Sequence, residues 1–298
     1  MEEFLTSTVR GVAQGSLYAL LGLGFVIVYK STRVVNFAQP VLMILGAYFT
    51  SAFAVDQGLP FPIAVLLAII VTALIAAAVE RVAMRPMVGE PPFSAAMVTV
   101  GVFFVLQTIA ADLIGSGQRG VGDPWGLDKF EVAGVTVFES DVARIVIAAV
   151  AVVALAVFFK YSRWGLAMRA TSFSQETALA QGVPVGRMFG LSWILAGILG
   201  AIAGMLVGTG GADFDQTTTL VALKALPAII LGGLDSIRGA IVGGVVIGLA
   251  EAYTKTYQDR HFEWVGSNFD QVVPYLVMLL VLLVRPYGLF GTPEVQRV

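Results

Sequence analysis

Residues 161–187 read YSRWGLAMRATSFSQETALAQGVPVGR, a polar segment between two long apolar runs. Ser172 and Gln175 have the spacing of a capping box, which predicts that a helix begins near them. Gly182 can adopt the left-handed conformation that ends many helices, so a short helix is expected over 173–181. Small side chains and a single ring share one face of this helix. Such a helix outside the membrane is expected to dock onto a partner; the alternative is a solvated loop with a helical turn.

The composition of the chain indicates a membrane protein. Of its 298 residues, 57% are hydrophobic and 13% are charged, whereas soluble domains carry about 25% charged residues. Apolar runs approaching the length of a transmembrane helix recur along the chain. We therefore expect an all-α, polytopic, glycine-rich fold with interrupted helices in each half. With no cysteine and a single histidine, thiolate metal sites and His-based clusters or triads are excluded. No cofactor is expected, and no basic cluster with interleaved aromatic residues indicates binding of nucleic acid.

Nine apolar segments are expected as spans of a single transmembrane domain over residues 1–298. The seventh is short and contains Pro227, so it either crosses the membrane or is re-entrant, which gives eight or nine crossings. A turn-rich loop over 115–141 contains the alternating stretch 129–138, which predicts a small hairpin. The expected spans are 11–29, 36–55, 61–82, 92–114, 142–159, 188–208, 220–233, 239–257 and 272–284.

Lysine and arginine gather in alternate loops, and loops rich in these residues face the cytoplasm. This bias predicts an N-terminus outside, a C-terminus inside, an external loop over 115–141 and a cytoplasmic helix over 173–181. The chain opens with Glu2 and Glu3 rather than with basic residues, so no cleaved signal peptide is expected. The basic residues assigned to the cytoplasmic side are Lys30, Arg33, Arg81, Arg85, Lys160, Arg163, Arg169, Arg187, Arg238, Arg285 and Arg297.

Two places break the apolar pattern inside the expected spans, one in each half of the chain. The first is Asn36–Pro40, where proline removes a backbone donor, and the second is the glycine-rich stretch Leu231–Gly244. Because unwound backbone is tolerated in a membrane where it lines a cavity, paired interruptions point to a substrate path. The alternative is that the glycines serve helix packing and a tight turn. The residues expected on the path are Asn36, Gln39, Gly232, Gly233, Asp235, Ser236, Gly239 and Glu251.

Glu251 lies midway along the eighth run, and an intramembrane carboxylate suggests a functional site. The alternative is a structural pair with Lys255 at i+4. Lys224, near the outer end of the seventh run, is expected to extend to the membrane interface. The sequence KST at 30–32 lacks the glycine that precedes the lysine of a phosphate loop, so no nucleotide site is expected. Energy for active transport then has to come from a partner subunit or an ion gradient.

Several segments in order give the chain a family resemblance over nearly its whole length. They resemble the integral-membrane permease of branched-chain amino-acid ABC importers, a family that also includes urea and short-chain amide permeases. At Gln39–Val41 the chain departs from the His-Gly-Glu usual in that family, which weakens an assignment to leucine, isoleucine or valine. The segments that carry the resemblance are Gly15–Gly24, Val35–Ala38, Gly46–Tyr48, Glu80–Pro86, Leu231–Gly244 and Leu283–Gly291.

The segment Glu176–Gly182, ETALAQG, resembles the EAAxxxG pattern of the coupling helix that seats in a groove of the ATPase. This resemblance implies two cytoplasmic ABC ATPases, a homologous second permease in a heterodimer, and an external solute-binding protein as partners. In the lead-in, Arg169–Ser174 replaces a sequence like RAVAQN, and this difference could tune the fit to a particular ATPase. The residues expected at the ATPase interface are Arg169, Phe173, Glu176, Ala178 and Gly182, preceded by the basic lead-in Arg163 and Gly165.

The chain is therefore expected to be a transport subunit of the bacterial inner membrane without enzymatic activity of its own. It would pass branched-chain amino acids or a related small solute by alternating access. The rival class is an ion-coupled secondary transporter or channel that uses Glu251, and uptake abolished by an uncoupler but insensitive to loss of ATP would identify it. A third alternative is a structural membrane scaffold, which would not copurify with an ATPase.

Overall fold

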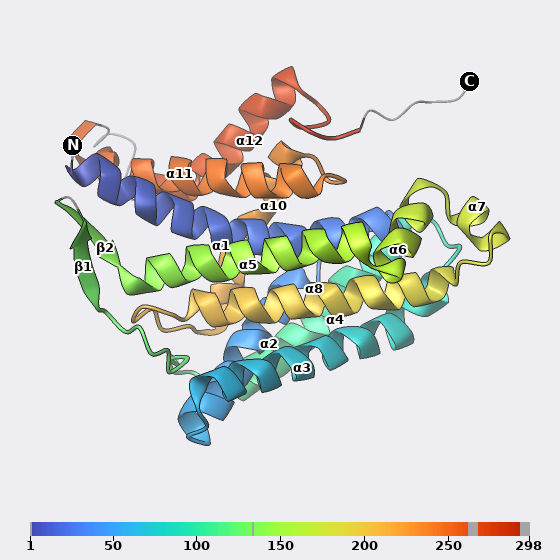
Figure 1. Ribbon diagram of the computed structural model, residues 1–298, viewed down its shortest axis with the longest axis horizontal. Coiled ribbons are helices and arrows are strands. Elements are labelled where there is room, and N and C mark those ends of the chain that lie inside the picture. The colour runs from blue at the N-terminus through green and yellow to red at the C-terminus, as the bar shows by residue number, and fades with distance from the viewer. Residues whose placement is uncertain (1, 133, 262–267, 293–298) are drawn as a thin grey trace.

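The computed structural model describes residues 2–132, 134–261 and 268–292. Long helices lie side by side, with a two-stranded hairpin near the N-terminus at one end and α6 and α7 at the other (Figure 1). The helices are α1 (Glu2–Thr32), α2 (Gln39–Ser51), α3 (Phe61–Val79), α4 (Pro92–Ile114), α5 (Glu139–Tyr161), α6 (Arg163–Phe173), α7 (Gln175–Ala180), α8 (Val185–Val207), α9 (Thr219–Leu223), α10 (Ala225–Gly232), α11 (Ile237–His261) and α12 (Val273–Val284). The strands are β1 (Lys129–Val132) and β2 (Val135–Phe138).

Seven helical segments in the described ranges are long and apolar enough to cross a membrane. They are α1, α2 with the π-helical turn after it, α3 with its continuation to Met87, α4, α5, α8, and α11 to Gln258. Two further apolar helices are shorter: α12, and Gln216–Gly232, which contains α9 and α10. The prediction of an all-α, polytopic membrane protein is confirmed. α4 has the bounds of the fourth apolar run, whereas α1 begins well before the first run, because its polar first turns are also helical.

α1 is the central helix of the bundle. In its most apolar window 83% of the residues are buried, against 17% in α4 and in α5. α4 and α5 instead expose large apolar side chains such as Phe104 and Val150. Side chains of this kind are stable on an outer surface when lipid, rather than water, surrounds it. The core therefore lies around α1, and α4 and α5 belong to the apolar periphery of the bundle.

Glycines let α1 and α11 pack backbone to backbone. A Cβ added to Gly15 would lie 2.7 Å from the Cα of Val245, and one added to Gly248 would lie 2.3 Å from the backbone nitrogen of Gly15. Real Cβ atoms do not come so close, so larger residues would force the helices apart. Gly11 and Gly15 on α1, and Gly244 and Gly248 on α11, repeat the four-residue spacing of small residues that favours close packing in membranes. The glycines of α1 and α11 therefore serve close helix packing.

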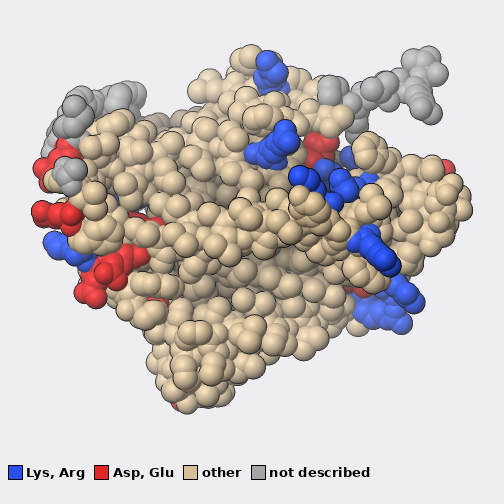
Figure 2. Space-filling model, viewed as in Figure 1, with Lys and Arg blue, Asp and Glu red and all other residues tan. Residues whose placement is uncertain are grey.

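The two ends of the bundle differ in structure and in charge. The hairpin pairs Lys129 with Phe138 in antiparallel register, as the alternating sequence predicted. We call this end the hairpin end and the opposite one the elbow end, where the elbow is α6, Ser174 and α7. On the face drawn in Figure 2, most lysine and arginine side chains gather toward the elbow end, and acidic side chains gather at the hairpin end. The bundle therefore carries a charge asymmetry along its long axis.

Candidate coupling site and solute pathway

The elbow consists of two helices separated by one extended residue. Ser174 has φ −156° and ψ 115°, and its side-chain oxygen accepts a hydrogen bond from the backbone N–H of Thr177 at 3.2 Å. Ser174 is therefore the N-cap of α7. The predicted start of the helix near Phe173, with Ser172 as cap, is wrong, because the Ser172 hydroxyl donates instead to the carbonyl of Arg169 at 2.7 Å within α6. Two neighbouring serines could each cap a helix, and the chain uses the second.

Gly182 ends α7 as predicted. It has φ +78°, a conformation that costs a residue with a Cβ about 1–2 kcal/mol. Its N–H donates to the carbonyl of Leu179 at 2.9 Å, and the N–H of Val183 donates to that of Ala178 at 2.9 Å. These two bonds form a Schellman motif, which satisfies the last carbonyls of the helix. The glycine thus fixes the direction in which the chain leaves the elbow and enters α8.

α7 presents one face to the protein and one to solvent. Ala178 is buried and packs with Val183, Val185 and Phe189 in a small apolar cluster. The solvent-facing side includes Glu176 and Leu179, and Phe173, immediately before the break, is 91% exposed. Arg169 and Gly182 are also exposed. Of the residues expected at a partner interface, Ala178 therefore faces inward and the other four face outward.

Two hydrogen bonds attach the elbow to the end of α1. The side-chain amide of Gln175 donates to the carbonyl of Ser31 at 3.3 Å. The guanidinium of Arg33 donates to the carbonyl of Ser172 at 3.3 Å. Arg33 itself has φ +61°, so the chain turns sharply where α1 ends. The elbow is therefore bonded directly to the end of the central helix.

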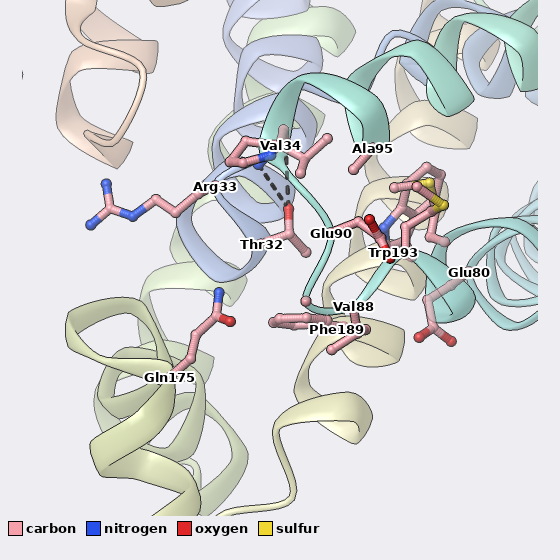
Figure 3. A pocket seen from close by; sticks show the side chains of 14 residues that line it. Thr32, Arg33, Val34, Glu80, Val88, Glu90, Ala95, Gln175, Phe189 and Trp193 are labelled. Atoms are coloured by element: carbon pink, nitrogen blue, oxygen red, sulfur yellow. Dashed lines mark hydrogen bonds between the residues drawn. The ribbon is translucent and has the colours of Figure 1, made fainter.

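A cavity of about 270 Å³ lies beside the elbow. In Figure 3, Gln175 of α7 lies on one side of this cavity, and Glu80 and Trp193 lie on the other. Glu80 pairs with Arg85 at 3.3 Å, and Arg85 also donates to the carbonyl of Gly186 at 3.2 Å. The segment Glu80–Pro86, which carries part of the family resemblance, thus connects the end of α3 to the start of α8. The cavity is the space between this connection, the elbow and the end of α1.

Asn36 and Gln39 are fully buried, and their amides bond within the protein. The Asn36 amide donates to the side-chain oxygen of Gln39 at 3.3 Å, and the Gln39 amide donates to the carbonyl of Ala196 at 3.1 Å. Pro40 lies in the first turn of α2, where its missing N–H would have no partner in any case. The expectation that this proline interrupts a span is therefore wrong, and the polar cluster holds α2 against α8.

The glycines between Leu231 and Gly244 form a tight turn and a close helix crossing at the elbow end. A Cβ on Gly232 would lie 2.0 Å from the carbonyl oxygen of Gly239, and Gly233 has φ +110°. The Ser236 side chain accepts from the N–H of Gly239 at 3.0 Å and so caps α11. Asp235 accepts from the N–H of Thr292 at 3.2 Å. Asp235 borders a small cavity of about 160 Å³.

The C-terminal segment continues this arrangement. The N–H groups of Leu289 and Phe290 donate to the carbonyls of Leu231 and Gly232, at 2.8 and 2.9 Å. The last carbonyls of α10 therefore bond to the segment after α12 rather than to water. The two expected halves of the pathway lie on different helix pairs: Asn36 and Gln39 between α2 and α8, and Gly232–Gly239 between α10 and α11.

Glu251 connects three helices inside the bundle. Its carboxylate accepts a hydrogen bond from the Tyr18 hydroxyl of α1 and pairs with the ammonium of Lys224, which lies at the break between α9 and α10. The expected pair with Lys255 is wrong, and so is the extension of Lys224 to the interface. The break turns Lys224 toward α11, where its side chain is 17% exposed. A buried charge is stable only when it is paired, and this pair meets that requirement.

The largest of the cavities described here, about 670 Å³, opens at the hairpin end, and we call it the hairpin-end cleft. Its α1 wall extends from Glu3 to Gln14, which is about 16 Å along a helix, and Glu251 lies at its inner limit. Of the charged lining residues, Glu251 was predicted from the sequence, whereas Arg10, Asp141 and Arg144 were not. Asp141 and Arg144, two charged residues at the start of an apolar run, were the sequence feature that could have indicated this site. The lining consists of Glu3, Ser7, Arg10, Gln14, Phe138, Ser140, Asp141, Arg144, Gly210, Glu251, Ala252, Lys255, Thr256 and Asp270.

The fold is thus a bundle of helices long and apolar enough to span a membrane, with a charged cleft at one end and an exposed elbow at the other, as in a polytopic membrane protein. The family model for the branched-chain amino acid transport system permease component matches residues 7–282, and the chain belongs to this family.

Relatives of the chain match it over nearly its full length. It is 29% identical to the high-affinity branched-chain amino acid transport system permease protein LivH of Escherichia coli K12, over 99% of this chain and 98% of LivH. It is 28% identical to BraD, a permease protein of the same description from Pseudomonas aeruginosa, over the same shares of the two chains. Among solved structures, PsaBC from Streptococcus pneumoniae in complex with Fab aligns with TM-score 0.51 over 97% of this chain and 94% of the other. At 14% identity, this similarity concerns the fold alone.

Proposed function

We propose that the chain is the permease subunit of an ATP-driven importer of the bacterial inner membrane. The observation that carries this proposal is the family match over residues 7–282. The substrate would be a branched-chain amino acid or a related small solute, because the relatives that match over the whole chain carry that description. The sequence contains no phosphate-loop motif. Hydrolysis of ATP would therefore take place on two partner ATPases, which drive alternating access in this subunit.

The elbow end would face the cytoplasm, with the N-terminus outside and the C-terminus inside. Clustering of lysine and arginine toward that end supports this orientation. The chain has no cysteine, so a single introduced cysteine is the only thiol. In intact cells, a membrane-impermeant thiol reagent should modify Glu131→Cys in the exposed hairpin, and Glu176→Cys only after permeabilisation. The reverse pattern would overturn the orientation.

The exposed face of the elbow would dock in the ATPase. The Phe173 ring is almost fully exposed, so a partner could bury it without disturbing the packing of the fold. Glu176, three residues later, adds an exposed charge. The bonds of Gln175 to Ser31 and of Arg33 to Ser172 support transmission of movement to α1. α1 extends to the hairpin-end cleft, so movement at one end would change access at the other. A homologous second permease and an external binding protein would complete the complex.

The docking proposal is tested by purifying the complex with its own ATPases. Phe173→Ala should weaken ATPase binding roughly ten- to thirtyfold, as expected for a central aromatic contact, and Glu176→Lys should also lower uptake. Leu127→Ala, at an exposed apolar side chain of the hairpin end, is the matched control and should change neither quantity. If Phe173→Ala and Glu176→Lys both left ATPase binding intact, the elbow would not be the coupling element.

An ion-coupled transporter is the second candidate, because Glu251 borders the cleft. The two mechanisms differ in their energy source. An importer driven by ATP should keep its uptake when an uncoupler dissipates the ion gradient, and should lose it when cellular ATP is depleted. The opposite result would assign the energy source to the gradient.

A further inference from the structure

We propose that the hairpin-end cleft is a binding site for a zwitterionic solute. Arg10 and Lys255 would bind the carboxylate of the solute, and Asp141 and Glu251 would bind its ammonium group. This inference rests on the proposed function for the direction of transport. The cleft volume, about 670 Å³, lies within the range of roughly 300–1,000 Å³ for small-molecule sites.

The position of the cleft suits a solute that enters the membrane from the hairpin end. Glu251 lies 14 residues after the start of α11 at Ile237, which places it about 21 Å from the elbow end of that helix. Beyond it, Gly15 and Gly248 bring the backbones of α1 and α11 into contact. α1 and α11 are also in contact beside the cleft, where the hydroxyls of Ser7 and Thr256 lie 2.8 Å apart. The cleft therefore follows this helix pair over only part of the length of the bundle, with Gln14 and Glu251 as its innermost lining residues on the two helices. A solute in the cleft would be accessible from one side of the membrane.

The cationic groups of the cleft are available to a ligand. Arg10 lies over the Phe138 ring, 5.0 Å from its centroid. In the described ranges neither Arg10 nor Lys255 has an acidic side chain within ion-pair distance, and both are exposed. A guanidinium presents a planar fork of donors that matches a carboxylate in two parallel bonds. Arg10 is thus the group best suited to bind the carboxylate of a solute.

Arg144 serves a different purpose. Its guanidinium donates to the carbonyls of Leu206 and Thr209, at 3.2 and 2.7 Å, and pairs with Asp141 at 3.4 Å. These bonds attach the start of α5 to the end of α8, so Arg144 is a positioning residue that holds Asp141 at the wall of the cleft.

The acidic groups keep unused acceptor capacity. An ionised carboxylate has about four acceptor sites. Glu251 uses two for Tyr18 and Lys224, and Asp141 uses one for Arg144. Both carboxylates line the cleft and are nearly buried, so an ammonium group there would be shielded from water and strongly attracted.

The charge balance favours a zwitterion over other solutes. The lining contains both cations and anions, and a solute of one sign would be repelled by one of the two sets. A neutral solute would leave Arg10 and Lys255 without a charged partner. Phe138 and Ala252 add apolar surface beside the charged groups, and this surface suits an aliphatic side chain.

The site is tested first by protection of a thiol in the full-length chain in nanodiscs. Thr256→Cys places the only thiol of the chain in the cleft, where a charged thiol reagent should modify it. L-leucine should slow the modification severalfold. Leucinamide, which lacks the carboxylate, and 4-methylpentanoate, which lacks the ammonium group, should each give little protection. Adding Arg10→Gln should abolish the protection by leucine, whereas Lys129→Gln, a cation of the hairpin outside the cleft, should preserve it. Equal protection by all three compounds, or none by leucine, would overturn the site.

Uptake by the complete transporter separates the two proposals. With its second permease, ATPases and binding protein in proteoliposomes, Arg10→Gln should raise KM for leucine roughly ten- to hundredfold, the loss expected for a charge-assisted pair. Arg10→Lys, which keeps the positive charge, should raise the KM for leucine less than Arg10→Gln does. Normal leucine uptake by Arg10→Gln would reject the site and leave the importer in place. Failure of the wild-type complex to take up leucine would instead reject the proposed substrate, while thiol protection would still decide whether the cleft binds zwitterions.

Discussion

Two of the buried polar clusters in the described part of the bundle differ in access to water. Asn36 and Gln39 are fully buried between α2 and α8, and their amides bond to each other and to the backbone. Glu251 is also nearly buried, with Tyr18 and Lys224 as partners, but it borders the hairpin-end cleft. A polar residue within a span is therefore a candidate for a pathway where a cavity reaches it, as at Glu251. Elsewhere the same residue types hold helices together.

The two clusters also differ in the free-energy cost of removing one partner and leaving the other unpaired. Amides are neutral, so an unpaired amide costs about 1–3 kcal/mol. A buried charge that loses its partner costs about 3–5 kcal/mol. Removing one partner from the charged cluster should therefore destabilise the fold more than removing one from the amide cluster, although the charged cluster lies beside the hairpin-end cleft.

The largest effect is expected for Glu251→Leu, which leaves the Lys224 ammonium buried without its partner. The substitution should lower the free energy of unfolding by about 3–5 kcal/mol, measured by denaturant unfolding of the purified protein in detergent. The double variant with Lys224→Met should cost less than Glu251→Leu alone, because both charges are then removed. Lys255→Met, an exposed lysine one turn away, is the control and should cost little. A double variant as costly as the sum of the single variants would contradict the pairing.

A smaller effect is expected for Gln39→Leu. It leaves the side-chain amide of Asn36 without the oxygen that accepts from it and removes the bond between α2 and the Ala196 carbonyl, so the free energy of unfolding should fall by about 1–3 kcal/mol. The KM for leucine should not change, because the cluster is closed to solvent. Gln181→Leu, at an exposed position, provides the control. A raised KM for leucine in Gln39→Leu, with an unchanged free energy of unfolding, would indicate that the Asn36–Gln39 cluster contacts the solute. The two clusters would then no longer differ in function.

Local features of the fold could be predicted from sequence because a few neighbouring residues determine them. The bounds of α4 follow from the length of an apolar run between prolines and a glycine. The end of α7 follows from Gly182, and the hairpin follows from alternation over 129–138. The break at Ser174 is also local, but Ser172 satisfies the same capping rule, and the pattern does not distinguish between them.

The candidate site was predicted only in part, because it depends on contacts between distant segments. Lys224 and Glu251 are 27 residues apart, and their pairing requires the break between α9 and α10. Arg10, Asp141 and Glu251 come from α1, α5 and α11. No spacing in the sequence brings those three helices together. Its place within an apolar run identified Glu251 as a candidate, but the cavity that it borders is a property of the packed bundle.

The smallest effect on stability is expected for a substitution of Asp215, a carboxylate whose surroundings differ from those of Glu251. It makes the same kind of bond as Glu251, a carboxylate accepting from a hydroxyl, but outside the spanning segments. The hydroxyl of Thr217 donates to it at 2.7 Å and the N–H of Thr217 at 2.8 Å, so that it caps the turn Gln216–Thr218. These hydrogen bonds hold the pKa of Asp215 below its ordinary value of 3.8, the hydroxyl of Thr217 contributing most.

Because the folded-state pKa is the lower one, the cap stabilises the protein above pH about 4, and this contribution is lost as the pH falls through the folded pKa. Asp215→Asn keeps a good cap, so stability at pH 7 should change by less than about 1 kcal/mol. The variant should lose less stability than the wild type between pH 5 and 3. Thermal unfolding in detergent across that range measures the difference, with Asp213→Asn, an exposed neighbour, as control. If Asp215→Asn were as destabilising as Glu251→Leu, burial would not explain the difference between the charged groups.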